Sequence, residues 1–238
     1  MRGWWQELAG LVLPVDCAGC GAARVLLCAG CREALSGAGA VRARLFPRPE
    51  GLPVVHAAAA YEGPVRAVLL AHKERGALPL AGALGAALAG AVLAGRGGSG
   101  GPWEREMVLV PVPSARRQVR ARGHDPTRRI ALAAAGRLRR AGVPARVAPV
   151  LRLRRAVRDQ AGLGARQRRE NLAGALEACP GAARLTDGAV LVLVDDLITT
   201  GATLAEAARA VRAAGLAQGT APRAAVVAAT RTDQKSCE

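Results

Sequence analysis

Two adjacent carboxylates and the short hydroxyl-rich segment after them are the residues of this chain best suited to chemistry. Asp195 and Asp196 follow the apolar run 190–194, and Thr199-Thr200-Gly201-Ala202-Thr203 comes next. Side chains this small let the backbone wrap an anion, and a helix predicted over 204–214 would add free N–H groups and a favourable dipole. Carboxylates do not bind phosphate. We therefore expect the acidic pair to hold the two hydroxyls of a ribose whose 5-phosphate lies in the threonine loop.

The sequence around these residues favours this interpretation. The run 190–194 contains only valine and leucine, which is typical of a strand buried on both faces of a parallel sheet. Ligands of open α/β sheets bind just outside the carboxyl ends of the strands, where the acidic pair would lie. In the alternative interpretation the aspartates only cap a turn and the threonines form an ordinary loop. Other phosphate-binding motifs do not fit: the chain has no G-x-x-x-x-G-K-[ST] segment, and no G-x-G-x-x-G segment follows a strand.

Four cysteines near the N-terminus form two CxxC pairs, Cys17 with Cys20 and Cys28 with Cys31. Each pair can place two thiolates on one tetrahedral ion, so together they predict a closed structural zinc site. Glycines at positions 19 and 30 suit the tight turns of such a site. Disulfide bonds are the alternative, and a reducing compartment disfavours them.

The remaining sequence predicts an α/β fold with a parallel sheet. Apolar segments that read as strands alternate with helical segments, which is the pattern of parallel sheets covered by helices. The expected strands are 54–61, 107–112, 145–153, 190–194 and 223–229, and the expected helices are 64–75, 78–94, 127–140 and 204–214. The basic stretch 154–170, which contains Gly and Gln, has the composition of a mobile lid.

Charge and composition bound the possible partners. The net charge is +16, and residues 116–169 hold seventeen arginines against Asp125 and Asp159. A basic face is expected, although only two lysines occur and the arginine excess also fits a GC-rich coding bias. Aromatic residues make up 2% of the chain, which argues against binding by extensive base stacking. We find no signal peptide or membrane span in the sequence, and expect a cytoplasmic protein.

The acidic pair with its threonine loop resembles the PRPP-binding signature of type I phosphoribosyltransferases, and nearly the whole chain resembles the ComF family of competence-associated, phosphoribosyltransferase-like proteins. One departure from the family pattern is His124-Asp125-Pro126, which follows Arg122-Gly123 where the family usually has Phe-Asn-Gln. The matching segments, in order, are the four cysteines, Tyr61-Glu-Gly63-Pro-Val-Arg66, Lys73, Val110-Pro-Val-Pro113, Arg120-Ala-Arg122-Gly123, Arg169-Glu170-Asn171 and Val194 to Thr203.

The resemblance implies a type I phosphoribosyltransferase-like domain over 51–238, with a five-stranded parallel sheet and helices on both faces, after an N-terminal zinc module and linker over 1–50. Asp195 and Asp196 would hold the ribose hydroxyls, and residues 199–203 the 5-phosphate. The segment 113–117, with Ser114 and Arg116, would face the pyrophosphate, and Mg²⁺ would accompany the PRPP. The lid residues Arg158, Gln160 and Arg166 would lie over C1.

Two functions follow from the resemblance. In the first, the protein is a phosphoribosyltransferase that displaces pyrophosphate from ribose C1, by way of a transition state like an oxocarbenium ion. In the second, it is a non-catalytic adaptor in DNA uptake that contacts single-stranded DNA or a helicase. The fold alone does not decide between them, because function depends on the site.

Overall fold

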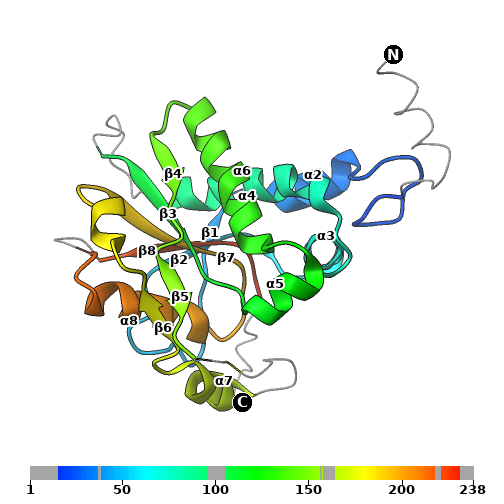
Figure 1. The fold of residues 1–238 in the computed structure, drawn as a ribbon. Helices are drawn as coiled ribbons and strands as arrows, with labels where there is room; N and C mark the ends of the chain where they lie inside the picture. Colours follow the sequence, from blue (N-terminus) through cyan, green and yellow to red (C-terminus); the bar gives the residue numbers. More distant parts are fainter. Residues whose placement is uncertain are drawn as a thin grey trace, which may run out of the picture.

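The main sheet of the computed structural model contains six strands in the order β1-β2-β8-β7-β3-β4 (Figure 1). All neighbouring strands are parallel except β1 and β2. The six strands are β1 (Val41–Arg42), β2 (Val55–Ala60), β3 (Met107–Pro111), β4 (Ala145–Val147), β7 (Val190–Ile198) and β8 (Arg223–Ala229). The structure describes residues 16–36, 39–95, 105–155, 157, 164–217 and 221–230. The predicted α/β class is confirmed, but the sheet has six strands where five parallel ones were predicted, because the short strand β1 adds an antiparallel edge to β2.

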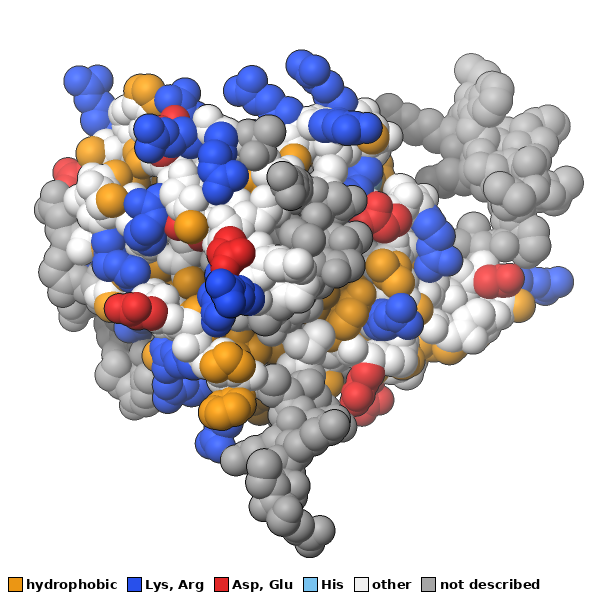
Figure 2. All heavy atoms as spheres, turned by 90° about the horizontal axis from the view of Figure 1, so that it is seen from below, with side chains coloured by type: hydrophobic (Ala, Val, Ile, Leu, Met, Phe, Trp, Pro, Cys, Tyr) orange, Lys and Arg blue, Asp and Glu red, His pale blue; other side chains and the backbone are white. Residues whose placement is uncertain are grey.

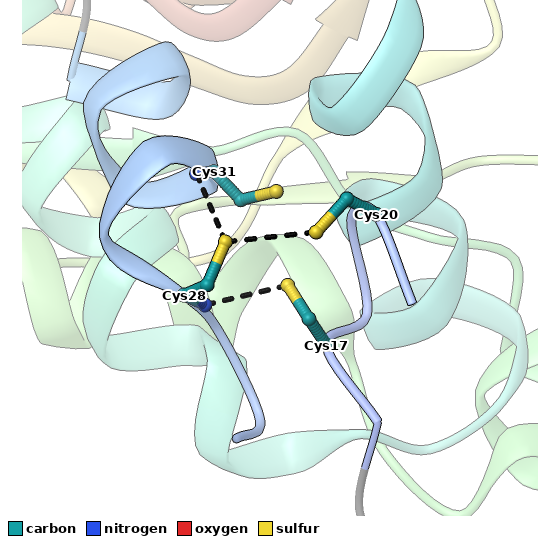
Figure 3. A group of neighbouring side chains, drawn as sticks. All are labelled: Cys17, Cys20, Cys28 and Cys31. Atoms are coloured by element: carbon teal, nitrogen blue, oxygen red, sulfur yellow. Dashed lines mark hydrogen bonds between the residues drawn. The ribbon is translucent and has the colours of Figure 1, made fainter. Parts of the chain in front are cut away.

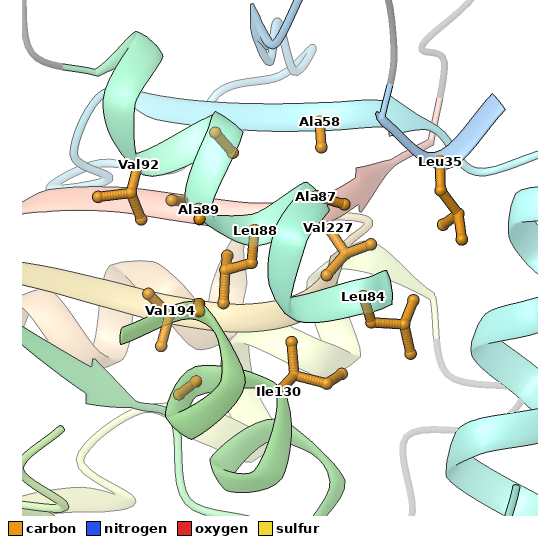
Figure 4. Packing of buried hydrophobic residues seen from close by; sticks show 14 of the residues in the cluster. Leu35, Ala58, Leu84, Ala87, Leu88, Ala89, Val92, Ile130, Val194 and Val227 are labelled. Carbon is orange, nitrogen blue, oxygen red and sulfur yellow. The ribbon is translucent and has the colours of Figure 1, made fainter. Parts of the chain in front are cut away.

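Helices cover both faces of this sheet. One face packs against α3 (Gly63–Glu74), α4 (Ala81–Ala94) and α6 (Pro126–Arg140), and the other against α8 (Ala202–Ala213). Figure 4 shows the first of these cores, where Leu84 and Leu88 of α4 belong to the same cluster as Val194 of β7 and Ile130 of α6. The central strands bury both faces, which explains their unbroken apolar sequence.

The cysteine-containing segment is part of the first core. The helix α2 (Ala29–Ser36) contacts α3 and α4, and its Leu35 is 1% exposed. Cys17 and Leu27 are buried in the same cluster of side chains. The N-terminal module therefore packs directly against the helices of the α/β domain.

One strand predicted from the sequence is broken in two. The expected strand 145–153 contains β4 in the main sheet and β5 (Leu151–Leu153), which pairs with β6 (Leu176–Ala178) in a separate antiparallel sheet. Between them Pro149 has no N–H to donate, and the N–H of Val150 turns back to the carbonyl of Ala148. The chain leaves the main sheet at this turn.

Part of the predicted lid is a packed helix. The helix α7 (Ala165–Leu172) lies against α8, although its charged sequence predicted a mobile segment. Its first turn is closed by the side chain of Gln167, which accepts a hydrogen bond from the N–H of Gly164. The predicted lid residues Arg158 and Gln160 lie outside the described residues. A further short helix, α5 (Arg116–Arg122), occupies part of the segment expected to be a loop after β3.

Short 3-10 helices occur at Leu78–Leu80 and Ala182–Leu185. Among the described residues, none of the helices combines the length and the apolar character that a membrane crossing requires.

Candidate functional site

The acidic pair lies where β7 extends beyond its neighbour β3. Pairing between these strands ends with Pro111 opposite Val194, followed by one hydrogen bond from the N–H of Val112 to the carbonyl of Val194. On its other side β7 stays paired with β8 as far as Ile198. The sequence predicted the aspartates just after the strand, whereas they lie within it, at the point where one flank of the strand becomes open.

A lysine from a distant helix neutralises the second aspartate. The Nζ of Lys73, in the last turn of α3, lies 2.7 Å from Oδ2 of Asp196. The Asp196 side chain is 6% exposed and that of Lys73 is 33% exposed, so this is a largely buried ion pair. The sequence shows two signals for this residue: Lys73 is among the segments that resemble the family named above, and it is one of only two lysines in a chain rich in arginine. A lysine offers a compact point charge that fits a single carboxylate oxygen.

The first aspartate is held by hydrogen bonds to one of its oxygens. Its Oδ1 accepts from the backbone N–H of Asp196 at 2.8 Å and from the hydroxyl of Thr127, in the first turn of α6, at 3.4 Å. Its side chain also interacts with the side chain of Asp196. Sequence reasoning did not identify Thr127 as a residue of the site.

The pKa values of Asp195 and Lys73 are shifted by burial and by the neighbouring charges. Burial raises the pKa of Asp195 well above its ordinary value, the charge of Asp196 raises it further, and Lys73 lowers it. Burial alone would lower the pKa of Lys73, but the charges of Asp196 and Asp195 outweigh it and this pKa is raised. One cation thus faces two carboxylates. Such perturbed groups gather preferentially at functional sites.

The predicted phosphate loop joins β7 to α8. Residues 199–201 form a bend, Gly201 precedes the helix with a φ of 75°, and the N–H of Ala202 lies 3.5 Å from the hydroxyl of Thr200. A side chain at position 201 would be strained by this φ and would meet Leu45 at 2.8 Å and Leu52 at 3.0 Å. Thr203 is half-buried in the first turn of α8. The chain therefore supplies the small residues and the helix start that the anion-binding prediction requires.

The other predicted ligand-binding residues are more dispersed. Ser114 is half-buried in the segment between β3 and α5, and Arg116 is exposed in the first turn of α5. This segment leaves the sheet beside the point where β7 becomes open. Arg166 is 86% exposed on α7 and pairs with Glu170 at 2.8 Å, and no contact of Arg166 with the acidic pair occurs among the described side chains.

The four N-terminal cysteines form a second candidate site, a metal centre. Their sulfur atoms all lie within 4.8 Å of one another, and Figure 3 shows them pointing inward from the turn at 17–20 and the start of α2. Sulfur atoms on one tetrahedral zinc ion lie about 3.8 Å apart, given Zn–S bonds of about 2.3 Å. The Sγ atoms of Cys20 and Cys28 are 3.6 Å apart. The predicted cluster is confirmed as one that could hold a metal ion such as zinc.

The ionisation of the four thiols affects how the cluster could hold a cation. Burial would raise the pKa of Cys17, but backbone N–H groups, first that of Cys28, lower it to about 6. Burial and the neighbouring thiols raise the pKa of Cys31. Without a metal ion the four sulfur atoms cannot all be deprotonated at neutral pH, and a bound dication removes this conflict.

Comparison with known proteins adds no further constraint on either site. No protein-family model matches the chain, and no curated protein matches it.

Proposed function

We propose that the protein binds PRPP or another ribose phosphate at the acidic pair and transfers its phosphoribosyl group with release of pyrophosphate. The observation that supports this best is the position of two carboxylates at the open flank of β7, directly before a small-residue loop and the start of α8. The carboxylate of Asp195 suits a ribose hydroxyl. The loop 199–203 suits the 5-phosphate, because its residues are small, three of them carry hydroxyls, and it leads into the start of α8.

In this proposal the chain orients the substrate, and its residues form no covalent intermediate. The bond between ribose C1 and the pyrophosphate oxygen breaks with its electron pair on the oxygen, and the acceptor forms the new bond at C1. Asp195 and Asp196 hold the hydroxyls, and Ser114 and Arg116 lie on the segment nearest the leaving pyrophosphate. Mg²⁺ would enter with the pyrophosphate oxygens and neutralise their charge. Arg158, Gln160 and Arg166 remain proposed lid residues.

The test is a titration of PRPP with Mg²⁺ into the wild type and into the double variant Asp195→Asn/Asp196→Asn. Charge-assisted hydrogen bonds contribute about 1.5 to 3 kcal/mol each, so we expect affinity to fall at least about 100-fold. Asp187→Asn is the matched control, because Asp187 is exposed and lies before β7. If the wild type binds no PRPP, or the double variant binds it equally well, the proposal fails.

The adaptor function stays the second candidate because of the basic surface. Lysine and arginine side chains are spread over the face drawn in Figure 2, with fewer acidic ones between them. A groove of about 390 Å³ between α7, α8 and residues 49–51 is lined by three arginines and two glutamates, one of which pairs with an arginine: Arg169, Arg209, Arg212, Glu50 and Glu206, with the pair between Arg209 and Glu206. In the same titration, binding of single-stranded DNA that survives the double Asp change and weakens steeply with salt would favour the adaptor.

A further inference from the structure

Two of the three histidines lie together beside the acidic pair, although no local sequence pattern predicts a role for either. The rings of His72, in α3, and His124, between α5 and α6, have centroids 5.6 Å apart and meet edge to face at 61°. His72 is fully buried and His124 is 9% exposed. They join two segments of the chain that are 52 residues apart.

Both nitrogen atoms of His124 face backbone carbonyls. Its Nδ1 lies 3.0 Å from the carbonyl of Arg122, in its own turn, and its Nε2 lies 3.2 Å from the carbonyl of His72, in α3. Carbonyl oxygens only accept, so a neutral ring donates to one of these carbonyls, according to its tautomer, and a protonated ring to both. The Nε2 contact is the one that links the two segments. With a hydrogen on Nε2, it satisfies a carbonyl near the C-terminal end of α3.

The residues that follow each histidine contact the acidic pair. Lys73, next to His72, pairs with Asp196, and Thr127, three residues after His124, donates to Asp195. Between His124 and Thr127, Asp125 caps α6 by accepting a hydrogen bond from the N–H of Arg128, which fixes the first turn. The contact from His124 to α3 therefore joins the segment that carries Lys73 to the segment that carries Thr127, and these two residues contact the aspartates.

A second contact joins the same two segments. Arg122, at the end of α5, donates to both oxygens of Glu74 at 2.9 and 2.7 Å, one residue after Lys73. This pair is near the surface, with Glu74 46% exposed, so solvent weakens it. The buried histidine contact is the better candidate for a fixed spacing between α3 and α6.

We propose that His124 is a positioning residue: through Nε2 it fixes the end of α3 against the start of α6, and so sets Lys73 and Thr127 on the acidic pair. This gives a role to the segment His124-Asp125-Pro126, which departs from the pattern of the family that the sequence resembles. The role requires no contact between His124 and the ligand. The ligand-binding part of the test rests on the proposed function, whereas the part that concerns Lys73 does not.

The test compares His124→Gln with His124→Asn. The amide nitrogen of glutamine can take the place of Nε2 and keep the link to α3, whereas that of asparagine takes the place of Nδ1 and keeps only the local bond. The first readout is the pKa of Lys73, measured by NMR on protein labelled at lysine. Because the only other lysine is Lys235, the variant Lys235→Arg assigns the two signals.

We expect the raised Lys73 pKa to persist in His124→Gln and to fall toward its ordinary value in His124→Asn. The affinity for PRPP with Mg²⁺ should follow the same order, with a loss of about 3- to 10-fold in His124→Asn only. Thermal melting of each variant separates this effect from a general loss of stability. A structural role alone would lower the melting temperature and leave the Lys73 pKa unchanged.

The outcomes separate the two proposals. If the Lys73 pKa falls in His124→Asn alone while the wild type binds no PRPP, the positioning role stands and the proposed function fails. If the wild type binds PRPP but the Lys73 pKa and the affinity are the same in all three proteins, the positioning role is overturned. Equal losses in the Gln and Asn variants would overturn it too, because they would show that the link through Nε2 is not what matters.

Discussion

The cysteine cluster and the acidic pair are built in opposite ways. All four sulfur atoms of the cluster come from residues 17–31, and two short turns bring them within 4.8 Å of one another. The acidic pair depends on Lys73 and Thr127, which are 123 and 68 residues away from the aspartates they contact. The sequence spacing of the four cysteines therefore predicts all four metal ligands. The sequence around Asp195 predicts the aspartates and the loop, but not the residues from α3 and α6 that contact them.

The two sites also differ in what balances their charge. The cluster could hold four thiolates only with a cation from outside the chain, since its thiols cannot all ionise together. The acidic pair already has a cation of the chain, because Lys73 pairs with Asp196. The pKa of Asp195 is nevertheless raised. We therefore expect metal loss to affect folding, and changes at the acidic pair to affect mainly local stability and ligand binding.

The largest expected effect is that of metal removal. Zinc in small Cys-ligated sites contributes about 10 to 16 kcal/mol of apparent binding free energy at neutral pH, much of it expressed as folding. Chelation, or Cys17→Ser/Cys28→Ser, should unfold residues 17–36 and lower the melting temperature, because Leu35 and Leu27 belong to the core. Metal analysis should find one zinc per chain.

Cys179→Ser is the matched control for the zinc prediction, since Cys179 lies outside the cluster. It should keep both the zinc and the melting temperature. Native protein without bound metal would contradict the prediction. It would show that the cysteine cluster, like the acidic pair, folds without a bound metal ion.

An intermediate effect is expected from Lys73→Met. Removing one partner of a buried pair leaves an unpaired charge, which costs about 3 to 5 kcal/mol in full burial. Because the Lys73 side chain is 33% exposed, we expect about 2 kcal/mol, measured by urea unfolding. The double variant Lys73→Met/Asp196→Asn should recover part of this loss, since Asp196 then carries no charge and only Asp195 is left without its cation.

Arg146→Met provides the control for the Lys73 prediction. Its pair with Glu106 has the same 2.7 Å separation, but the two side chains are 35% and 42% exposed, so the loss should stay below about 1 kcal/mol. Equal losses of unfolding free energy for Lys73→Met and Arg146→Met would show that the pair of Lys73 and Asp196 contributes no more to stability than a surface ion pair.

The smallest expected effect has the opposite sign: Asp195→Asn should stabilise the protein at neutral pH. The pKa of Asp195 is raised in the folded chain, so the folded state binds more protons than the unfolded state between the two pKa values. Wild-type stability therefore falls as pH rises from the unfolded pKa to the folded one. Asparagine removes this fall, and gains from relieved sites are typically about 0.5 to 2 kcal/mol.

Melting curves of wild type and Asp195→Asn from pH 4 to pH 8 measure this effect, and they should diverge as the pH rises. Asn keeps an oxygen that can accept from Thr127 and the N–H of Asp196, so the local hydrogen bonds survive. A variant that is less stable than wild type at every pH would mean that Asp195 is a structural cap.

Much of the sheet could be predicted from the sequence, because strands buried on both faces carry an unbroken apolar signal. Each of the five expected segments contains a strand of the main sheet. The prediction of one strand over 145–153 was wrong, because Pro149 has no backbone N–H and breaks the strand there. The proline leaves the segment apolar, so hydrophobicity alone did not reveal the break. The helix α7 was missed for the converse reason, since a charged sequence gives no sign that its helix packs on α8.

The candidate site was predictable to the extent that it is local. Asp195, Asp196 and the loop 199–203 follow one another in the chain, and their order carried the hypothesis. The roles of Lys73, Thr127 and His124 depend on how α3 and α6 meet, and no local pattern encodes that meeting. The scarcity of lysine was the one local sign that Lys73 differs from the surrounding arginines.

The open flank of β7 has a consequence for the exchange of backbone hydrogens with solvent. From Val192 to Val194 the strand is paired on both sides with other strands, whereas the N–H of Asp196, on the flank that β3 has left, is bonded by the carboxylate of Asp195. The protection of this one amide is therefore set by a side chain. A ligand that draws the carboxylate away would release the amide hydrogen, while the amides of 192–194 would stay protected by the sheet.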